Sequence, residues 1–193
     1  MKKILYLVLI FAILPITPIC KADTFTFSPT PPDLYDLDHH YYFIWGINWR
    51  LPAGHTLVDV VLTIKNIDDW TNEDGDHLYI NLLDTAPVGV SWDYDGQGYA
   101  NHFSGNPLIV DYQDPGPGKE TLVYSFKSLG LLQTFLTYIS DGNFGIGFDP
   151  DCHYWNDGVT LEITTVPEPT TLLLLGTGLI CFAIFSRLKL AKK

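Results

Sequence analysis

Aspartates concentrate in two polar stretches of the sequence, one ending before residue 78 and the other near residue 150. Carboxylate oxygens are the ligands that calcium prefers, and the ion takes several of them at once. The EF-hand pattern does not fit the first stretch, because placing Gly75 at the glycine position of that loop puts Trp70 and Asn81 where acidic ligands belong. A calcium site of another geometry and a set of solvated turns both remain as interpretations. The candidate ligands are Asp68, Asp69, Asp74, Asp76, Asp149 and Asp151.

Histidine and cysteine offer ligands for transition metals at two places. His39 and His40 are adjacent, and Cys152 precedes His153. Structural zinc sites space their paired ligands by a few residues, and neighbouring residues of a strand point to opposite faces. We therefore predict that these side chains lie at the surface without a transition metal, so calcium is the one cofactor that the sequence suggests.

Tryptophans in or beside polar loops are candidates for binding sugars, because an exposed indole can stack on a sugar ring. Aromatic side chains also cap the open ends of β-sandwiches, so a packing role is the alternative. The candidates are Trp70, Trp92 and Trp155.

Signatures of catalysis are weak in this sequence. No Gly-x-Ser-x-Gly segment occurs, and carboxylates are so numerous that no acid–base pair stands out. We therefore predict a protein that is not an enzyme and that binds glycan or calcium. The alternative is a secreted hydrolase that acts on polysaccharide.

Short strands must position these residues, since aromatic and β-branched residues recur in short runs between turns rich in glycine, proline and aspartate. One segment, 128–140, has apolar residues at helical spacing and is predicted to be a helix. The predicted elements do not alternate between strand and helix as in βαβ units. The predicted fold class is therefore all-β, an antiparallel β-sandwich of jelly-roll type with one short helix. The predicted strands are 24–27, 40–49, 56–66, 77–84, 107–112, 120–126, 143–148 and 158–165.

Two details of strand packing can also be predicted. The segments on either side of the proline- and glycine-rich turn 113–118 are expected to form a hairpin. In the strand 56–66, alternation predicts one apolar face directed toward the core. That face consists of Val58, Val60, Leu62 and Ile64.

Charge is distributed unevenly along the chain. Residues 23–165 contain four Lys and Arg residues against 21 Asp and Glu residues, a net charge of −17. A field of this sign repels phosphate, so nucleic acid is not a predicted partner. Cys152 is the one cysteine of this segment, which leaves it no internal disulfide.

Both ends of the sequence have the features of membrane-targeting segments. Residues 1–22 combine a basic start, an apolar run and Ala22 at a cleavage position, as in a signal peptide whose apolar run is helical. Near the other end, residues 172–185 contain no charge and precede four basic residues. With its flanking residues this run makes about 26 Å of helix, just enough to span a bilayer. We therefore predict a C-terminal transmembrane helix with a cytoplasmic end.

Two prolines separate the last strand from this helix and hold the chain extended, so neither element can run through them. The Pro-Glu-Pro motif, the leucine-rich run after it and the basic end together resemble the PEP-CTERM sorting signal of Gram-negative bacteria. The resemblance implies that Pro167, Glu168 and Pro169 are recognised by exosortase, a membrane protease. It also implies exopolysaccharide as a partner.

The central segment resembles carbohydrate-binding-like and choice-of-anchor jelly rolls. This resemblance rests on Leu51-Pro52-Ala53-Gly54 before a strand and on the helix-then-strand passage from Leu131 to Gly147. It implies the jelly-roll fold and transfers no ligand site.

These patterns predict three parts of the chain: a signal peptide at 1–22, an acidic β-sandwich domain at 23–165 and a PEP-CTERM sorting tail at 166–193. The protein is then exported through the inner membrane and anchored by its C-terminal helix. Processing by exosortase releases it to the cell envelope or the exterior.

Overall fold

The computed structural model describes residues 21–70, 76–96, 100–113, 116, 118–168, 176–183 and 187. Residues Ala22–Val166 form one compact unit, and the residues on either side belong to a second unit. The apolar run of the predicted signal helix lies outside the described residues, and so do Asp74 and Pro169 of the predicted sites.

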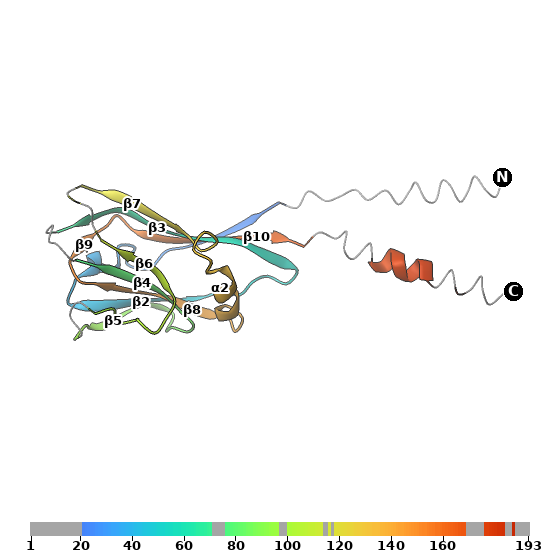
Figure 1. The fold of residues 1–193 in the computed structure, drawn as a ribbon, viewed down its shortest axis with the longest axis horizontal. Coiled ribbons are helices and arrows are strands. Elements are labelled where there is room, and N and C mark those ends of the chain that lie inside the picture. Colours follow the sequence, from blue (N-terminus) through green and yellow to red (C-terminus); the bar gives the residue numbers. More distant parts are fainter. Residues whose placement is uncertain are drawn as a thin grey trace. The chain divides into compact units, whose positions relative to one another are not determined.

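Two antiparallel sheets make up most of the compact unit (Figure 1). One sheet has the strand order β1-β10-β3-β7, with β9 paired to β3, and the other has the order β5-β2-β8-β4-β6. The only α-helix of the compact unit's described residues is α2 (Leu132–Tyr138). The strands are β1 (Asp23–Phe27), β2 (Tyr41–Asn48), β3 (His55–Asp69), β4 (Leu78–Leu83), β5 (Gly89–Tyr94), β6 (Leu108–Tyr112), β7 (Glu120–Ser125), β8 (Asn143–Pro150), β9 (Tyr154–Trp155) and β10 (Val159–Pro167).

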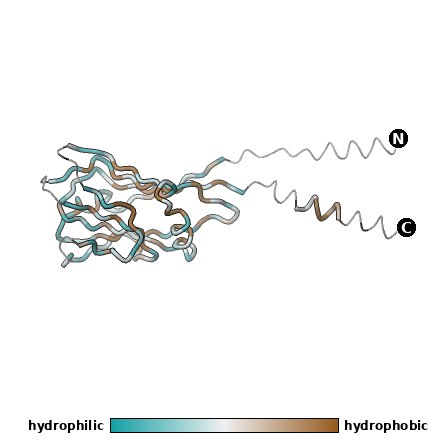
Figure 2. The backbone as a smooth tube through the Cα atoms, viewed as in Figure 1, coloured by the Kyte–Doolittle hydropathy of each residue, from teal (hydrophilic) through white to brown (hydrophobic). Residues whose placement is uncertain are grey.

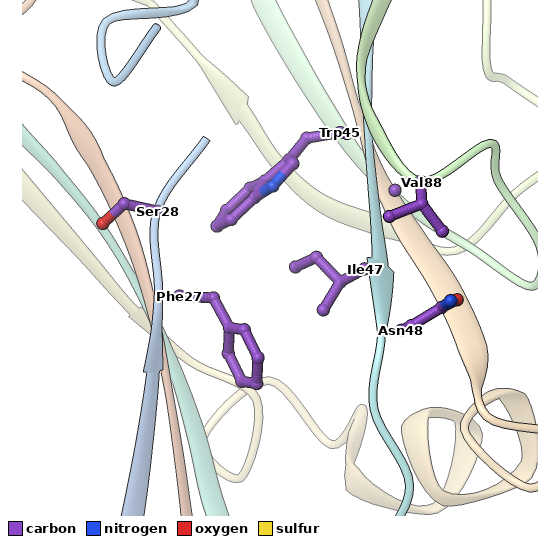
Figure 3. Close-up of a pocket in the computed structure, with 8 residues that line it drawn as sticks. Phe27, Ser28, Trp45, Ile47, Asn48 and Val88 are labelled. Carbon is purple, nitrogen blue, oxygen red and sulfur yellow. The ribbon is translucent and has the colours of Figure 1, made fainter. Parts of the chain in front are cut away.

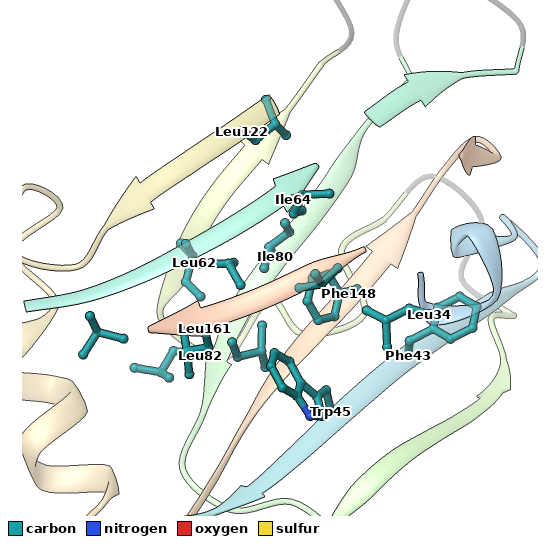
Figure 4. Close-up of a cluster of buried hydrophobic side chains, with 14 of the residues drawn as sticks. Leu34, Phe43, Trp45, Leu62, Ile64, Ile80, Leu82, Leu122, Phe148 and Leu161 are labelled. Atoms are coloured by element: carbon teal, nitrogen blue, oxygen red, sulfur yellow. The ribbon is translucent and has the colours of Figure 1, made fainter. Parts of the chain in front are cut away.

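One apolar core lies between the two sheets, as predicted for a β-sandwich. Hydrophobic stretches run along the strands (Figure 2), and their inward side chains from both sheets meet in a single cluster (Figure 4). Val60, Leu62 and Ile64 of β3 have no exposed surface, which confirms the predicted inner face at these three positions, whereas Val58 is half-buried. Full burial of such a side chain contributes about 1.5–3 kcal/mol to the free energy of unfolding.

The predicted hairpin around residues 113–118 is wrong. β6 pairs with β4 in one sheet, whereas β7 pairs with β3 in the other. The connection between them, 113–119, is longer than the two to about five residues of a usual hairpin loop, so it does not force its flanking strands to pair. Each strand instead adds its apolar side chains to the core from its own sheet.

Two strands, β5 and β9, were not predicted. β5 is an edge strand that is mostly exposed, so its sequence lacks the apolar alternation of a half-buried strand. The helix is shorter than predicted because Gly130 has a φ of 72°, a left-handed conformation that cannot belong to a right-handed helix.

A left-handed turn, η1 (Leu34–Leu37), precedes β2. Its four residues all have positive φ angles, although none is a glycine. Such a conformation costs roughly 1–2 kcal/mol per residue. The complete burial of Leu34 and Leu37 in the core offsets this cost and holds the turn in place.

The C-terminal segment is described in part. Of the predicted membrane helix, residues 176–183 are helical, hydrophobic (Figure 2) and exposed. Within the described residues, no helix combines the length and the hydrophobicity that crossing a membrane requires.

Substitution of Gly46 in β2 tests how closely this strand packs against the backbone of Pro87. A Cβ atom at this position would lie 1.9 Å from the backbone oxygen of Pro87. We expect Gly46→Ala to lower the free energy of unfolding by about 1–3 kcal/mol, the usual cost of overpacking, as measured by urea denaturation. Gly105→Ala is the matched control, since nothing lies within 4 Å of the added atom. Equal stability of the two variants would contradict this packing.

Candidate functional site: a buried carboxylate cluster

The register between β4 and β8 gathers acidic residues at one end of their sheet. Leu78 pairs with Pro150, and the backbone N–H of Asp151 donates to the backbone oxygen of His77 at 2.7 Å. Asp76, just before β4, therefore comes near Asp151, just after β8. The sequence predicted these two aspartates as parts of separate stretches, and the structure unites them.

The short pairing of β9 with the end of β3 adds a third group. Asp69 is directly opposite Tyr154, and Asp68 is opposite Trp155. One potential ligand atom each from Asp69, Asp76 and Cys152 lies within 4.8 Å of the others, and all three residues are buried. We call these three residues the acid–thiol triad. They come from the end of β3, the segment before β4 and the turn between β8 and β9.

Asp149, Asp95 and His102 form a second group, which Asp151 links to Asp76 of the triad through its interactions with both groups. Asp149 has no exposed surface. Its Oδ2 accepts a hydrogen bond from the backbone N–H of His102 at 2.7 Å, while its Oδ1 has no partner among the described residues. Asp95 places its Oδ1 3.7 Å from Nδ1 of His102, and the imidazole ring stacks on Tyr42 with the ring centroids 3.7 Å apart.

Burial changes the acidity of two carboxyl groups in this cluster. Desolvation, together with the charge of Asp95, raises the pKa of Asp149 to about 6 against the opposing hydrogen bond from His102. Desolvation, then the charges of Asp149 and, more weakly, Asp95 and Asp76, raise the pKa of Asp151 to about 7. Both side chains therefore hold protons more tightly than exposed aspartates do.

Tyr154 lies against the acid–thiol triad. It is completely buried, and its hydroxyl has no hydrogen-bond partner among the described residues. Burial raises the pKa of this hydroxyl, and the charges of Asp69, Asp76 and Cys152 raise it further. The phenol is therefore a neutral polar group beside three acidic ones.

The domain has few basic side chains that could balance the negative charge of this cluster. Its four basic residues, Arg50, Lys65, Lys119 and Lys127, are all exposed, and the Arg50 guanidinium donates to the backbone oxygen of Asp141. Buried carboxyl groups of this kind are stable when they are protonated or when they bind a cation. The arrangement can therefore take up protons or metal ions.

Other predicted ligands lie elsewhere or differ in their surroundings. Asp68 is half-buried on the face of β3 opposite to Asp69. The prediction that Cys152 is a surface residue is wrong, because it is buried in the triad. His39 and His40 do lie at the surface, where they form a small group with Asp38.

The three predicted tryptophans are exposed and occupy two surfaces. Trp70 and Trp155 stack on each other with their ring centroids 6.0 Å apart, and their exposed fractions are 58% and 44%. Trp92 packs against Tyr35 of the left-handed turn at 4.7 Å. Together with Asp38, Tyr41 and Phe43, Trp92 and Tyr35 line a pocket of about 190 Å³.

An apolar groove of about 260 Å³ lies between β1 and β2. Phe27 of β1 and Trp45 and Ile47 of β2 point into it (Figure 3). Its described lining contains no titratable side chain.

Sequence reasoning missed Asp95 and His102. Asp95 lies in the polar turn after Trp92, a turn that fits the EF-hand template no better than residues 70–81 do. Its burial depends on the pairing of the edge strand β5 with β2, which the sequence did not predict. No sequence signal identifies His102, since its place beside Asp149 follows only from the folded connection before β6.

Comparisons with known proteins identify the C-terminal tail and assign no family to the domain. The family model of the PEP-CTERM protein-sorting motif matches residues 165–187. No curated protein matches the chain. Among solved structures, the chain is similar to a recombinantly expressed latent aurone synthase (polyphenol oxidase), with 14% identity and a TM-score of 0.33. That similarity covers 65% of this chain and 24% of the aurone synthase.

Asp149 makes stability depend on pH when no metal is present. Its pKa is 3.8 in the unfolded chain and about 6 in the folded one. The folded state therefore binds more protons between these values, and the free energy of unfolding should fall as the pH rises from about 4 to about 6. Thermal unfolding in chelator should show this fall, and Asp149→Asn should reduce it. Asp84→Asn, at an exposed position after the opposite end of β4, is the control; equal pH profiles of the two variants would contradict the assignment.

Proposed function

Because residues 165–187 carry a PEP-CTERM protein-sorting motif, we propose that this chain is an exported, non-catalytic protein of the cell envelope or extracellular matrix. In this proposal residues 1–22 direct export, residues 23–165 are the functional domain, and residues 166–193 anchor the chain until exosortase processes it. The sorting motif is the observation that carries the proposal. The motif itself implies export, C-terminal anchoring at the membrane and processing by that membrane enzyme.

The domain's charge and the chemistry of its tail support an extracellular destination. Four basic residues against 21 acidic ones keep the domain soluble and give it no affinity for nucleic acid. Pro167 ends the last strand, and Glu168 after it is exposed. A protease can therefore reach this part of the motif. Exopolysaccharide is the proposed partner of the released domain.

Strand order supports a jelly-roll fold for this domain. Leaving aside β5 and β9, successive strands alternate between the two sheets except at β4 and β6, which are neighbours. This winding gives two four-stranded sheets in the orders β1-β10-β3-β7 and β2-β8-β4-β6. An eight-stranded, double-sheet arrangement of this kind is found in lectin domains among others.

Exposed aromatic rings support glycan binding as the activity of the domain. The stacked indoles of Trp70 and Trp155 form an exposed aromatic surface. At the second surface, the strained turn η1 holds Tyr35 against Trp92, and the Asp38 carboxylate lines the same pocket. An aromatic floor with a nearby hydrogen-bond acceptor suits the alternating faces and hydroxyls of a sugar.

The alternative function is a secreted hydrolase acting on polysaccharide. The observation that favours it is the pair Asp149 and Asp151, both with a raised pKa. Glycosidases use one such carboxyl group as a general acid and a second as a base or nucleophile.

Exosortase processing can be tested by changing the described part of the motif. In a host that contains exosortase, replacing both Pro167 and Glu168 with alanine should leave the full-length chain in the membrane fraction and reduce the released form at least tenfold. Mass spectrometry of the released C-terminus measures this. Glu162→Ala, an exposed change within β10, should be processed normally. Unchanged release of the double variant would exclude recognition of these residues.

Glycan binding can be separated from hydrolysis on a glycan array followed by analysis of the sugars for cleavage. Trp92→Ala and Trp155→Ala should each weaken binding by about tenfold, which corresponds to a loss of about 1.4 kcal/mol of binding free energy, and no sugar should be cleaved. Val123→Ala is the control, since Val123 is 60% exposed on β7. Cleavage that Asp149→Asn abolishes would support the hydrolase instead.

A further inference from the structure

We propose that the acid–thiol triad of Asp69, Asp76 and Cys152 is a binding site for a divalent transition-metal ion of the zinc class. The proposal does not rest on the sorting tail or on glycan binding. It differs from the sites that the sequence suggested, which separated the aspartates from the cysteine.

The first argument is that the fold brings three potential ligand atoms together. The three residues come from separate segments, yet one ligand atom of each lies within 4.8 Å of the other two. Oxygen and sulfur ligands bind zinc at about 2.0–2.3 Å in a tetrahedron, so the ligand atoms of one ion lie about 3.3–3.8 Å apart. A contraction of the triad by about 1 Å would bring all three ligand atoms into contact with a single ion.

The second argument is the presence of buried polar atoms without partners at the same place. Oδ2 of Asp76 and the hydroxyl of Tyr154 make no hydrogen bond among the described residues, and these residues are only 7% and 0% exposed. Leaving such groups unsatisfied costs about 1–3 kcal/mol each, and more for a charged group. A metal ion would ligate the Asp76 oxygen directly. The Tyr154 hydroxyl would then be the fourth polar group at the ion, as a ligand or as a partner of a bound water.

The third argument concerns charge. Two carboxylates and a thiolate together carry three negative charges, which a buried site cannot hold without compensation. The domain's four basic side chains are exposed. A divalent ion would cancel most of this charge and favour the ionised form of each ligand.

The thiol decides which ion fits. Calcium and magnesium take oxygen ligands, and calcium needs six to eight of them. Thiolate ligands instead select zinc and other soft or borderline ions, while carboxylates remain compatible with zinc. Among the described residues, the other group of three potential ligands is Asp38, His39 and His40, which is exposed and hence open to competition from water.

Cobalt provides a direct readout, because a thiolate bound to Co²⁺ gives a charge-transfer absorption in the near ultraviolet. The full-length chain, purified in detergent and stripped with chelator, would be titrated with Co²⁺ and then with Zn²⁺. The starting protein carries Cys20→Ser and Cys181→Ser, so that Cys152 is its one thiol. We expect the charge-transfer band to appear, Zn²⁺ to abolish it, and Zn²⁺ to raise the unfolding temperature more than Ca²⁺ does.

Variants of the triad assign the ligands. In this background, Cys152→Ser should remove the band, and Asp76→Asn should weaken Co²⁺ binding at least tenfold, whereas Asp84→Asn should change neither. If Cys152→Ser fails to fold, protection of Cys152 from alkylation by Zn²⁺ in the starting protein gives the same answer. Absence of the band and of protection would overturn the proposal. So would a band that survives Cys152→Ser, or stabilisation by Ca²⁺ equal to that by Zn²⁺.

Discussion

The antiparallel register of β4 with β8 is the constraint on which the chemistry of this domain depends. With Leu78 opposite Pro150, the residues just outside the paired strands, Asp76 on one side and Asp151 and Cys152 on the other, must share one end of the sheet. A shift of one residue would send these side chains to opposite faces. The apolar core fixes this register, because Leu78, Ile80 and Phe148 are completely buried.

Because side chains alternate between the two faces along β3 and β9, buried acidic residues and exposed tryptophans lie on opposite faces there. Asp69 and Tyr154 are opposite each other and point inward to the buried cluster. Their neighbours Trp70 and Trp155 are exposed and stack on each other. A metal ion held by Asp69 would therefore also fix the strand pairing that aligns the two indoles. The proposed ion site and one proposed sugar-binding surface share the short pairing of β9 with the end of β3.

Much of the fold was predictable from local patterns, and much of the site was not. Alternating apolar residues in β3 identified its inner face, and the Pro-Glu-Pro motif identified the sorting tail. The triad has no such pattern, since Asp69 and Cys152 are 83 positions apart and meet only through the β3–β9 pairing. Likewise, the apolar strands β6 and β7 gave no sign that they belong to different sheets, because that choice depends on partners distant in the sequence.

Two buried carboxyl groups beside one thiol are the basis of the proposed metal site. Anomalous diffraction at the zinc edge, from crystals of the exported protein purified without chelator and supplied with Zn²⁺ and Ca²⁺, tests this interpretation most directly. The account predicts an anomalous peak between Asp69, Asp76 and Cys152, with Sγ as a ligand. A triad without a peak, or an ion bound only by oxygens of Asp149 and Asp151, would contradict it.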